Sequence, residues 1–140
     1  MRFWDSSALG ALLVDEADSH RRAEQLRKDP VIAVWWATPV ECESAIQRHQ
    51  RDGTLFAAGA RQARERLAEL ASAWHEAPPQ PGLRTLAVRL LRTHPLRAAD
   101  ALQLAAALTL CTALGRQIEF VCADDRLASA AEIENLPVVR

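Results

Sequence analysis

The chain has 140 residues, a length that suits one domain and leaves little room for two. Its formal net charge is −1, so no global basic field marks it as a nucleic-acid-binding protein, although a local basic patch would suffice. Its three cysteines include no CxxC pair, which argues against a disulfide framework and a zinc knuckle and is typical of reduced thiols in a cytoplasmic protein.

Strand and helix signals alternate along the first half of the sequence. The predicted elements are a short strand at Arg2–Trp4, a helix from Ser6 or Ser7 to about Ala17, a helix over Ser19–Lys28, a strand at Val31–Trp36 and a helix that Thr38 caps and Gly53 stops. The run Val31–Trp36 is rich in β-branched and aromatic residues, which is typical of a strand buried on both faces.

The second half continues the alternation. It is predicted to contain a long helix over Thr54–Trp74, a short edge strand within residues 75–82, a helix over Leu83–Thr93, an apolar helix over Arg97–Leu114, a strand at Ile118–Ala123, a helix over Asp125–Asn135 and a last strand at Leu136–Arg140. The longest apolar run, Leu104–Cys111, is too short to span a bilayer, so we expect no membrane insertion. Strands separated by helices predict an α/β fold with a mainly parallel central sheet.

Acidic residues follow the predicted strands at four separate places. Asp5 follows the first strand, Glu41 lies in the helix after the second, Asp100 begins the apolar helix, and Asp124 follows the strand at Ile118–Ala123, with Asp125 beside it. A parallel sheet gathers such residues at its carboxyl edge, where ligands bind. Clustered carboxylates repel one another unless a cation binds, and oxygen ligands favour Mg²⁺ or Mn²⁺. Such a site predicts phosphodiester hydrolysis, since the metal activates water and holds a phosphate oxygen.

Each of these acids also has a purely structural interpretation. Asp5 and Asp124 are suitable helix caps, and the dipole of a helix favours an acid in its first turn, as at Glu41 and Asp100. The coincidence of four such residues at one edge of the sheet favours a site over four unrelated caps.

The segments "DSSALGALL", "TPVECESAI", "PLRAADALQLAAAL" and "FVCADDRLASAA", in this order, resemble PIN-domain nucleases and are most similar to VapC toxins of bacterial toxin–antitoxin pairs. The resemblance runs from about Phe3 to Val139. It implies one PIN-like domain over residues 1–140, a three-layer α/β/α sandwich with a mainly parallel central sheet. It further implies a Mg²⁺- or Mn²⁺-dependent endoribonuclease that acts as a toxin, with transfer RNA as the family-level substrate, a cognate antitoxin and a homodimer.

By the same resemblance, the four acidic positions of the family fall on Asp5, Glu41, Asp100 and Asp124. Asp5, Asp100 and Asp124 would hold the metal, while Glu41 would ligate it or position the attacking water. The family's serine after the first aspartate matches Ser7, which would orient Asp5 or bound water.

Two alternatives stay open at this point. Glu43 is a second candidate for the acid of its helix, but it lies about 200° round from Glu41, so both cannot face one site. The family often has threonine two residues before its fourth acid, where this chain has Cys122, and Asp125 therefore remains an alternative to Asp124.

A local run of basic residues accompanies the acids. Between Ala77 and Ala99 there is no acid, and the RNA-binding candidates Arg89, Arg92 and Arg97 lie there. A solvated helix face explains these arginines equally well. Of Trp35 and Trp36, at least one is expected in the core, and an exposed one would suit stacking on bases.

Three other classes of protein compete with a nuclease. A haloacid dehalogenase phosphatase needs a second aspartate where Ser7 stands. A receiver domain needs an early acidic pair and a late lysine, and Lys28 is the chain's single lysine. The third is a catalytically inactive PIN-like module that binds RNA or a protein partner, against which the intact set of four acids argues.

Overall fold

The computed structural model describes all 140 residues and has a five-stranded sheet at its centre. Its strands are β1 (Arg2–Trp4), β2 (Ile32–Trp35), β3 (His75–Ala77), β4 (Phe120–Val121) and β5 (Val138–Val139). They lie in the order β3-β2-β1-β4-β5, and every pairing is parallel. The predicted parallel sheet is therefore confirmed, and β1 is its central strand.

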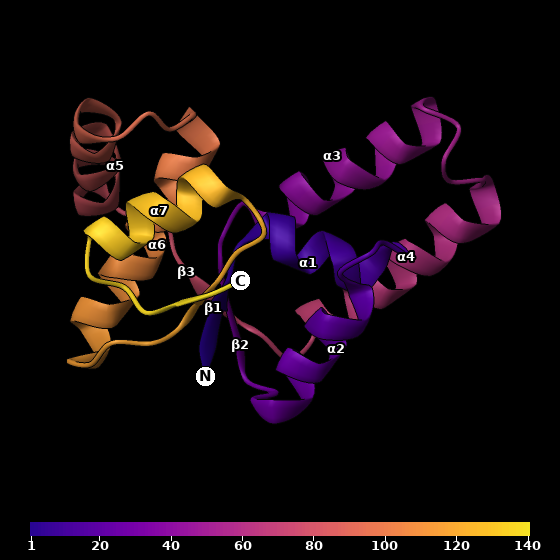
Figure 1. Cartoon of the computed structure of the whole chain (residues 1–140), viewed down its shortest axis with the longest axis horizontal. Coiled ribbons are helices and arrows are strands. Elements are labelled where there is room, and N and C mark those ends of the chain that lie inside the picture. The colour runs from indigo at the N-terminus through magenta and orange to yellow at the C-terminus, as the bar shows by residue number, and fades with distance from the viewer.

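Helices cover both faces of this sheet (Figure 1). One layer contains α1 (Ser6–Leu13), α2 (Ser19–Lys28), α3 (Thr38–Arg51) and α4 (Ala57–Ala71), and the other contains α5 (Pro81–Thr93), α6 (Ala98–Leu114) and α7 (Asp125–Ile133). This arrangement is the expected α/β/α sandwich. None of these helices is long and apolar enough to cross a membrane.

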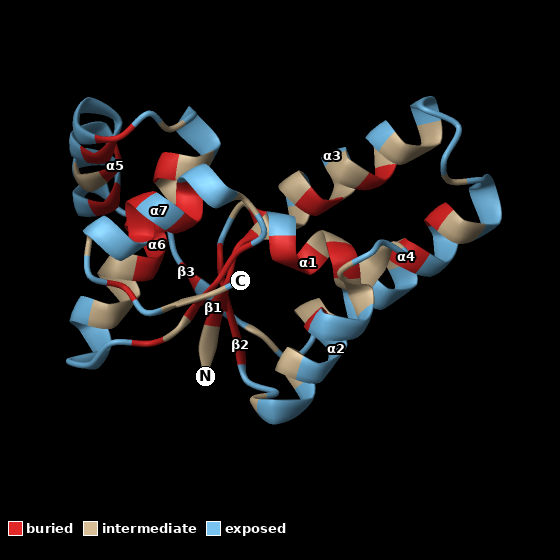
Figure 2. Ribbon diagram, in the orientation of Figure 1, coloured by how far each residue is buried: buried red, intermediate tan, exposed pale blue.

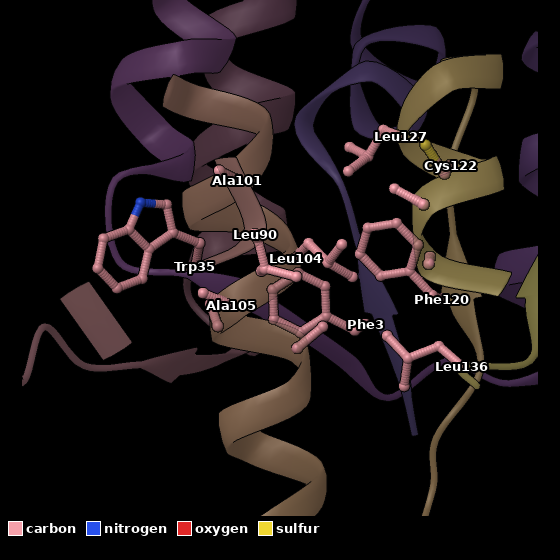
Figure 3. Close-up of a cluster of buried hydrophobic side chains, with 14 of the residues drawn as sticks. Phe3, Trp35, Leu90, Ala101, Leu104, Ala105, Phe120, Cys122, Leu127 and Leu136 are labelled. Carbon is pink, nitrogen blue, oxygen red and sulfur yellow. The ribbon is translucent and has the colours of Figure 1, made fainter. Parts of the chain in front are cut away.

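The central strands are buried on both faces (Figure 2). Because side chains alternate across a strand, Phe3 points toward α6 while Trp4 points toward α1 and α3. Phe3 stacks on Phe120 of the neighbouring strand at 5.7 Å between ring centroids, and Leu104 packs in the same cluster (Figure 3). Two hydrophobic cores, one on each face, hold β1 in place and so fix the residue that follows it.

Helices α3 and α4 extend away from the sheet as a pair (Figure 1). A separate small cluster of Ile46, Ala60 and Ala63 holds them together. At the turn that joins them, Phe56 is 82% exposed.

Several element boundaries differ from those predicted. The first helix ends at Leu13 instead of Ala17, because Val14 is already extended. The helix predicted over Thr54–Trp74 begins only at Ala57, since Gly53 adopts φ 73° and starts a turn. The strand predicted at Val31–Trp36 is confined to Ile32–Trp35.

Two further predictions need correction. Thr38 was expected to cap α3, but Ala37 occupies the cap position. The buried hydroxyl of Thr38 instead accepts a hydrogen bond from the side-chain amide of Gln103 on α6. The strand predicted at Ile118–Ala123 is reduced to Phe120–Val121, because only these residues are paired with both neighbouring strands.

Candidate active site

The carboxyl end of β1 delivers Asp5 to the edge of the sheet. Its backbone N–H donates to the carbonyl of Val121 at 3.0 Å, so Asp5 lies beside the end of β4, from which the chain continues to Asp124. α1 begins immediately after Asp5, and α3 begins shortly after the end of β2. The topology therefore brings together three of the four segments that the sequence marked as acidic, those of Asp5, Glu41 and Asp124.

Asp5 is a buried carboxylate, with only 3% of its surface exposed. Its Oδ2 caps α1 by accepting the backbone N–H of Ser7 at 3.0 Å, and it also accepts the Ser7 hydroxyl. Burial raises the pKa of Asp5 to about 6; the bonds from Ser7 oppose this shift, and the negative charges of Glu41 and Asp100 add to it. A helix cap alone does not require such burial.

Glu41 and Glu43 diverge from one another on α3. Oε2 of Glu41 accepts the hydroxyl of Ser6 at 2.7 Å and the amide nitrogen of Gln103 at 3.1 Å. Glu43 instead faces α4, where Arg64 binds it through Nη2 at 2.8 Å and Nε at 3.1 Å. Glu41 is thus the acid of α3 that lies near Asp5.

Asp100 and Asp124 each lie at the start of a helix. Oδ2 of Asp100 accepts the backbone N–H of Arg97 at 3.2 Å, and Oδ1 of Asp124 accepts that of Leu127 at 2.9 Å. Both residues are half-buried. Asp125, by contrast, is 96% exposed at its side chain and lies 3.8 Å from Nε of Arg140.

The turn between β4 and Asp124 is held from two sides. The Ser7 hydroxyl accepts the backbone N–H of Ala123 at 3.0 Å, so one serine contacts both Asp5 and this turn. On the other side, the fully buried Arg22 of α2 donates from Nη2 to the carbonyl of Cys122 at 3.1 Å. Burial raises the pKa of the Cys122 thiol to about 12, so the thiol stays protonated and lies 3.8 Å from Oδ2 of Asp5.

Sequence reasoning did not single out Ser6, Gln103 or Arg22 as part of this site. An adjacent pair of serines after a strand is typical of a helix start. A glutamine or an arginine in a helix is ordinarily predicted to be exposed. Only Ser6 carried a local signal, since it neighbours Asp5. The other two are recognisable only by their burial.

A groove of about 380 Å³ runs between α1 and α3, and Glu41 is the one of the four acids that lines it. Ser6, Ser7 and Glu41 line one end, and Arg48 and His49 line the other. The groove therefore adjoins the acidic edge at Glu41 and leads from it toward the basic residues at the far end of α3.

The basic residues around the site differ in their availability. Arg89 forms a bidentate ion pair with Glu134, at 3.0 and 2.6 Å, so its guanidinium is already engaged. The guanidinium groups of Arg92 and Arg97 belong to exposed residues and form no ion pair with a carboxylate. Trp35 is 5% exposed and belongs to the core, whereas Trp36 is 54% exposed.

The four acids offer carboxylate oxygens, which are the ligands that hard divalent cations prefer. Each engages one carboxylate oxygen in hydrogen bonds within the chain and leaves the other without one. None of the four forms a salt bridge, whereas Glu43, Asp125 and Glu134 each do. No three His, Cys, Asp or Glu side chains are grouped closely enough to ligate one ion together. Mg²⁺ usually takes one or two carboxylates and keeps several waters, so this donor set fits it.

Fold and site together define an α/β protein with an acidic centre at the carboxyl edge of a parallel sheet. The family model described as "PIN domain" matches residues 2–133, and the chain therefore belongs to the PIN domain family. No curated protein matches this sequence.

Solved structures from three organisms are among those that share the fold. FitAcB from Neisseria gonorrhoeae aligns at a TM-score of 0.69 and 14% identity, covering 100% of this chain and 97% of that one. VapBC2 from Rickettsia felis, bound to a DNA fragment from their promoter, aligns at 0.66 and 13%, covering 99% and 96%. PAE2754 from Pyrobaculum aerophilum aligns at 0.63 and 20%, covering 92% and 83%. At these identities the likeness establishes the fold.

Proposed function

We propose that residues 1–140 form one metal-dependent endoribonuclease domain, the VapC-type toxin of a toxin–antitoxin pair, acting in the cytoplasm. The observation that carries this proposal is that the four carboxylates are neither fully hydrogen-bonded nor paired with a basic side chain. Asp5, Glu41, Asp100 and Asp124 each keep one oxygen free of hydrogen bonds, and no basic side chain neutralises them. Membership of the PIN domain family supports a nuclease.

The proposed roles follow from where each acid lies. Asp5, Asp100 and Asp124 would hold Mg²⁺ or Mn²⁺, directly or through water, and Glu41 would ligate the ion or position the attacking water. When bound, the cation lowers the pKa of water and offsets negative charge on the phosphate. The negative charges of Glu41 and Asp100, which raise the pKa of Asp5, would be offset at the same time.

The rest of the chain prepares these acids for the reaction. Ser7 fixes Asp5 and the turn before Asp124, and Ser6 fixes Glu41. Water attacks phosphorus, the bond to the 3′ oxygen breaks, and the products carry a 3′-hydroxyl and a 5′-phosphate. Because Oε2 of Glu41 is already occupied, Oε1 is the atom available to orient that water.

The remaining parts of the proposal concern partners. Arg92 and Arg97 contact RNA phosphates near the scissile bond, and transfer RNA is the substrate to test first. A cognate antitoxin blocks the site, and the toxin forms a homodimer. FitAcB and VapBC2, which share the fold over nearly their whole length, support an antitoxin partner.

Induced expression of wild type and Asp5→Asn, with mapping of RNA 5′ ends, tests the function. We expect growth arrest and discrete cuts with the wild type alone. In vitro, EDTA should stop cleavage by the purified protein and Mg²⁺ should restore it. Full cleavage by a folded Asp5→Asn variant would refute the proposed site. A wild type that neither cuts RNA nor binds Mn²⁺ in calorimetry would instead be a catalytically inactive PIN-like module.

A further inference from the structure

Gln103 is a buried polar side chain on α6, with only 1% of its surface exposed. Its amide nitrogen has two hydrogens and two acceptors, Oε2 of Glu41 at 3.1 Å and the hydroxyl of Thr38 at 3.3 Å. Its carbonyl oxygen Oε1 is buried without a hydrogen-bond partner. Buried polar atoms are rarely left unpaired in native proteins, and here it is the oxygen that lacks a partner because the nitrogen is turned toward Glu41.

The chemistry of an amide suits this position. With the amide reversed, Oε1 would face the carboxylate of Glu41, so the nitrogen must point toward Glu41. A lysine or arginine in its place would neutralise the charge that a cation needs, and a second glutamate would repel the first. An amide donates two hydrogen bonds and adds no net charge.

Three helices meet at a single oxygen atom of Glu41. Ser6 reaches Oε2 from α1 and Gln103 reaches it from α6, while Glu41 itself belongs to α3. Asp100 lies three residues before Gln103 and about 60° round the helix, so both project from one side of α6. Gln103 therefore ties the helix of Asp100 to the helix of Glu41.

Resting on the proposed function, we infer that Gln103 is a positioning residue of this metal site. It acts through Glu41: it holds Oε2 and leaves Oε1 for the cation or its water. Partners that orient metal ligands in this way contribute about tenfold to a hundredfold to metal affinity or activity.

Gln103→Met tests this inference, because methionine keeps the length of the side chain and removes both donors. We expect Mn²⁺ binding in calorimetry to weaken by about tenfold or more, and kcat to fall with little change in KM for RNA. Gln47→Met is the matched control: Gln47 donates to Glu43 at 3.0 Å in the same helix as Glu41, and its loss should leave Mn²⁺ binding unchanged.

The Glu41→Gln background separates positioning from a merely structural role. If Gln103 acts through Glu41, Gln103→Met should weaken Mn²⁺ binding no further in that background. An equal loss in both backgrounds would overturn the inference, as would a folded Gln103→Met variant with the Mn²⁺ affinity of the wild type.

A measurement on the unaltered side chain covers the case in which Gln103→Met fails to fold. The side-chain amide signals of Gln103 in ¹⁵N-correlated NMR spectra should shift when Mg²⁺ is added, and Glu41→Gln should abolish the shift. Signals that stay in place while Mg²⁺ binds would overturn the inference.

The proposed function fails separately from this inference. Wild-type protein that binds no Mn²⁺ and cuts no RNA refutes both. Wild-type protein that binds Mn²⁺ and loses that binding in Asp5→Asn, but keeps it in Gln103→Met, refutes the role of Gln103 alone.

Discussion

The hydroxyl of Ser6 donates to Oε2 of Glu41 at 2.7 Å and so joins the first turn of α1 to the first turn of α3. Ser7, its neighbour, holds Asp5 in the same way. Two adjacent serines thus each fix one carboxylate of the acidic edge. The segment after β1 therefore supplies one acid, Asp5, together with the two serine hydroxyls that orient Asp5 and Glu41.

Ser6→Ala should weaken Mn²⁺ binding by about tenfold, because Glu41 loses one of its two donors and gains conformational freedom. Calorimetry with Mn²⁺ measures the effect. Ser72→Ala is the control, since its hydroxyl contacts only the carbonyl of Glu69, on α4. An unchanged affinity in Ser6→Ala would show that the contact does not support the proposed site.

Asp5→Asn should stabilise the metal-free protein at neutral pH while abolishing cleavage. The pKa of Asp5 is raised from 3.8 to about 6, so the folded state binds its proton more tightly than the unfolded state does. The stability penalty therefore grows as pH rises from about 4 to about 6, and about two pKa units correspond to at most ~3 kcal/mol.

Urea unfolding in EDTA at pH 4 and pH 7 measures this effect. The gain in unfolding free energy from Asp5→Asn should be largest at pH 7 and small at pH 4, where the native aspartate is protonated in the folded state. An equal gain at both pH values would contradict the burial of a charge as its cause.

Glu43→Gln should leave Mn²⁺ binding and cleavage unchanged, whereas Glu41→Gln should impair both. The two glutamates are two residues apart on α3, yet Glu43 is paired with Arg64 on α4 and Glu41 lies near Asp5. Parallel cleavage assays and calorimetry of the two variants make each the control for the other. Loss of activity in Glu43→Gln alone would reassign the acid of α3.

Glu134→Gln should destabilise the protein by about 2 kcal/mol at pH 7, since charge-assisted hydrogen bonds contribute about 1.5–3 kcal/mol each. Hydrogen bonds from Arg89, and then from His94, lower the pKa of Glu134 to about 2. This stabilisation is present above about pH 4.5 and is lost as pH falls toward 2.

Urea unfolding of wild type and Glu134→Gln at pH 7 and pH 3 checks this assignment. The difference between the two proteins should shrink at pH 3. Glu132→Gln, which alters an exposed ion pair with Arg140, is the control. A difference that stays constant with pH would exclude the charge of Glu134 as its origin.

Arg97→Met and Arg92→Met should each weaken RNA binding uniformly across sequences, because phosphate contacts carry no sequence information. Each lost contact with single-stranded RNA should reduce the slope of log affinity against log salt by about 0.7. Binding to a catalytically inactive Asp5→Asn background, measured over a range of salt concentrations, avoids cleavage during the experiment. Arg116→Met, beyond the far end of α6, should leave the slope unchanged.

Much of the fold followed from the local pattern of the sequence. The helix Ser19–Lys28 and the strand Arg2–Trp4 have the predicted bounds, because a serine start, a proline stop and an apolar run are local signals. The placement of Asp5 at the carboxyl edge followed in turn, since parallel strands end at one edge of a sheet.

Contacts between helices needed the tertiary structure. Spacing showed that Glu41 and Glu43 cannot face the same site, but only the packing of α3 against α1 and α4 decided which of them meets Ser6 and which meets Arg64. Likewise, a glutamine in a helix is ordinarily exposed, and only the approach of α6 to α3 buries Gln103 against Glu41. The sequence by itself determined the order of the elements and the edge where the acids gather, because these depend on local preference and strand direction. The partners of each carboxylate depend on side chains far apart in the chain, and only the folded structure brings those together.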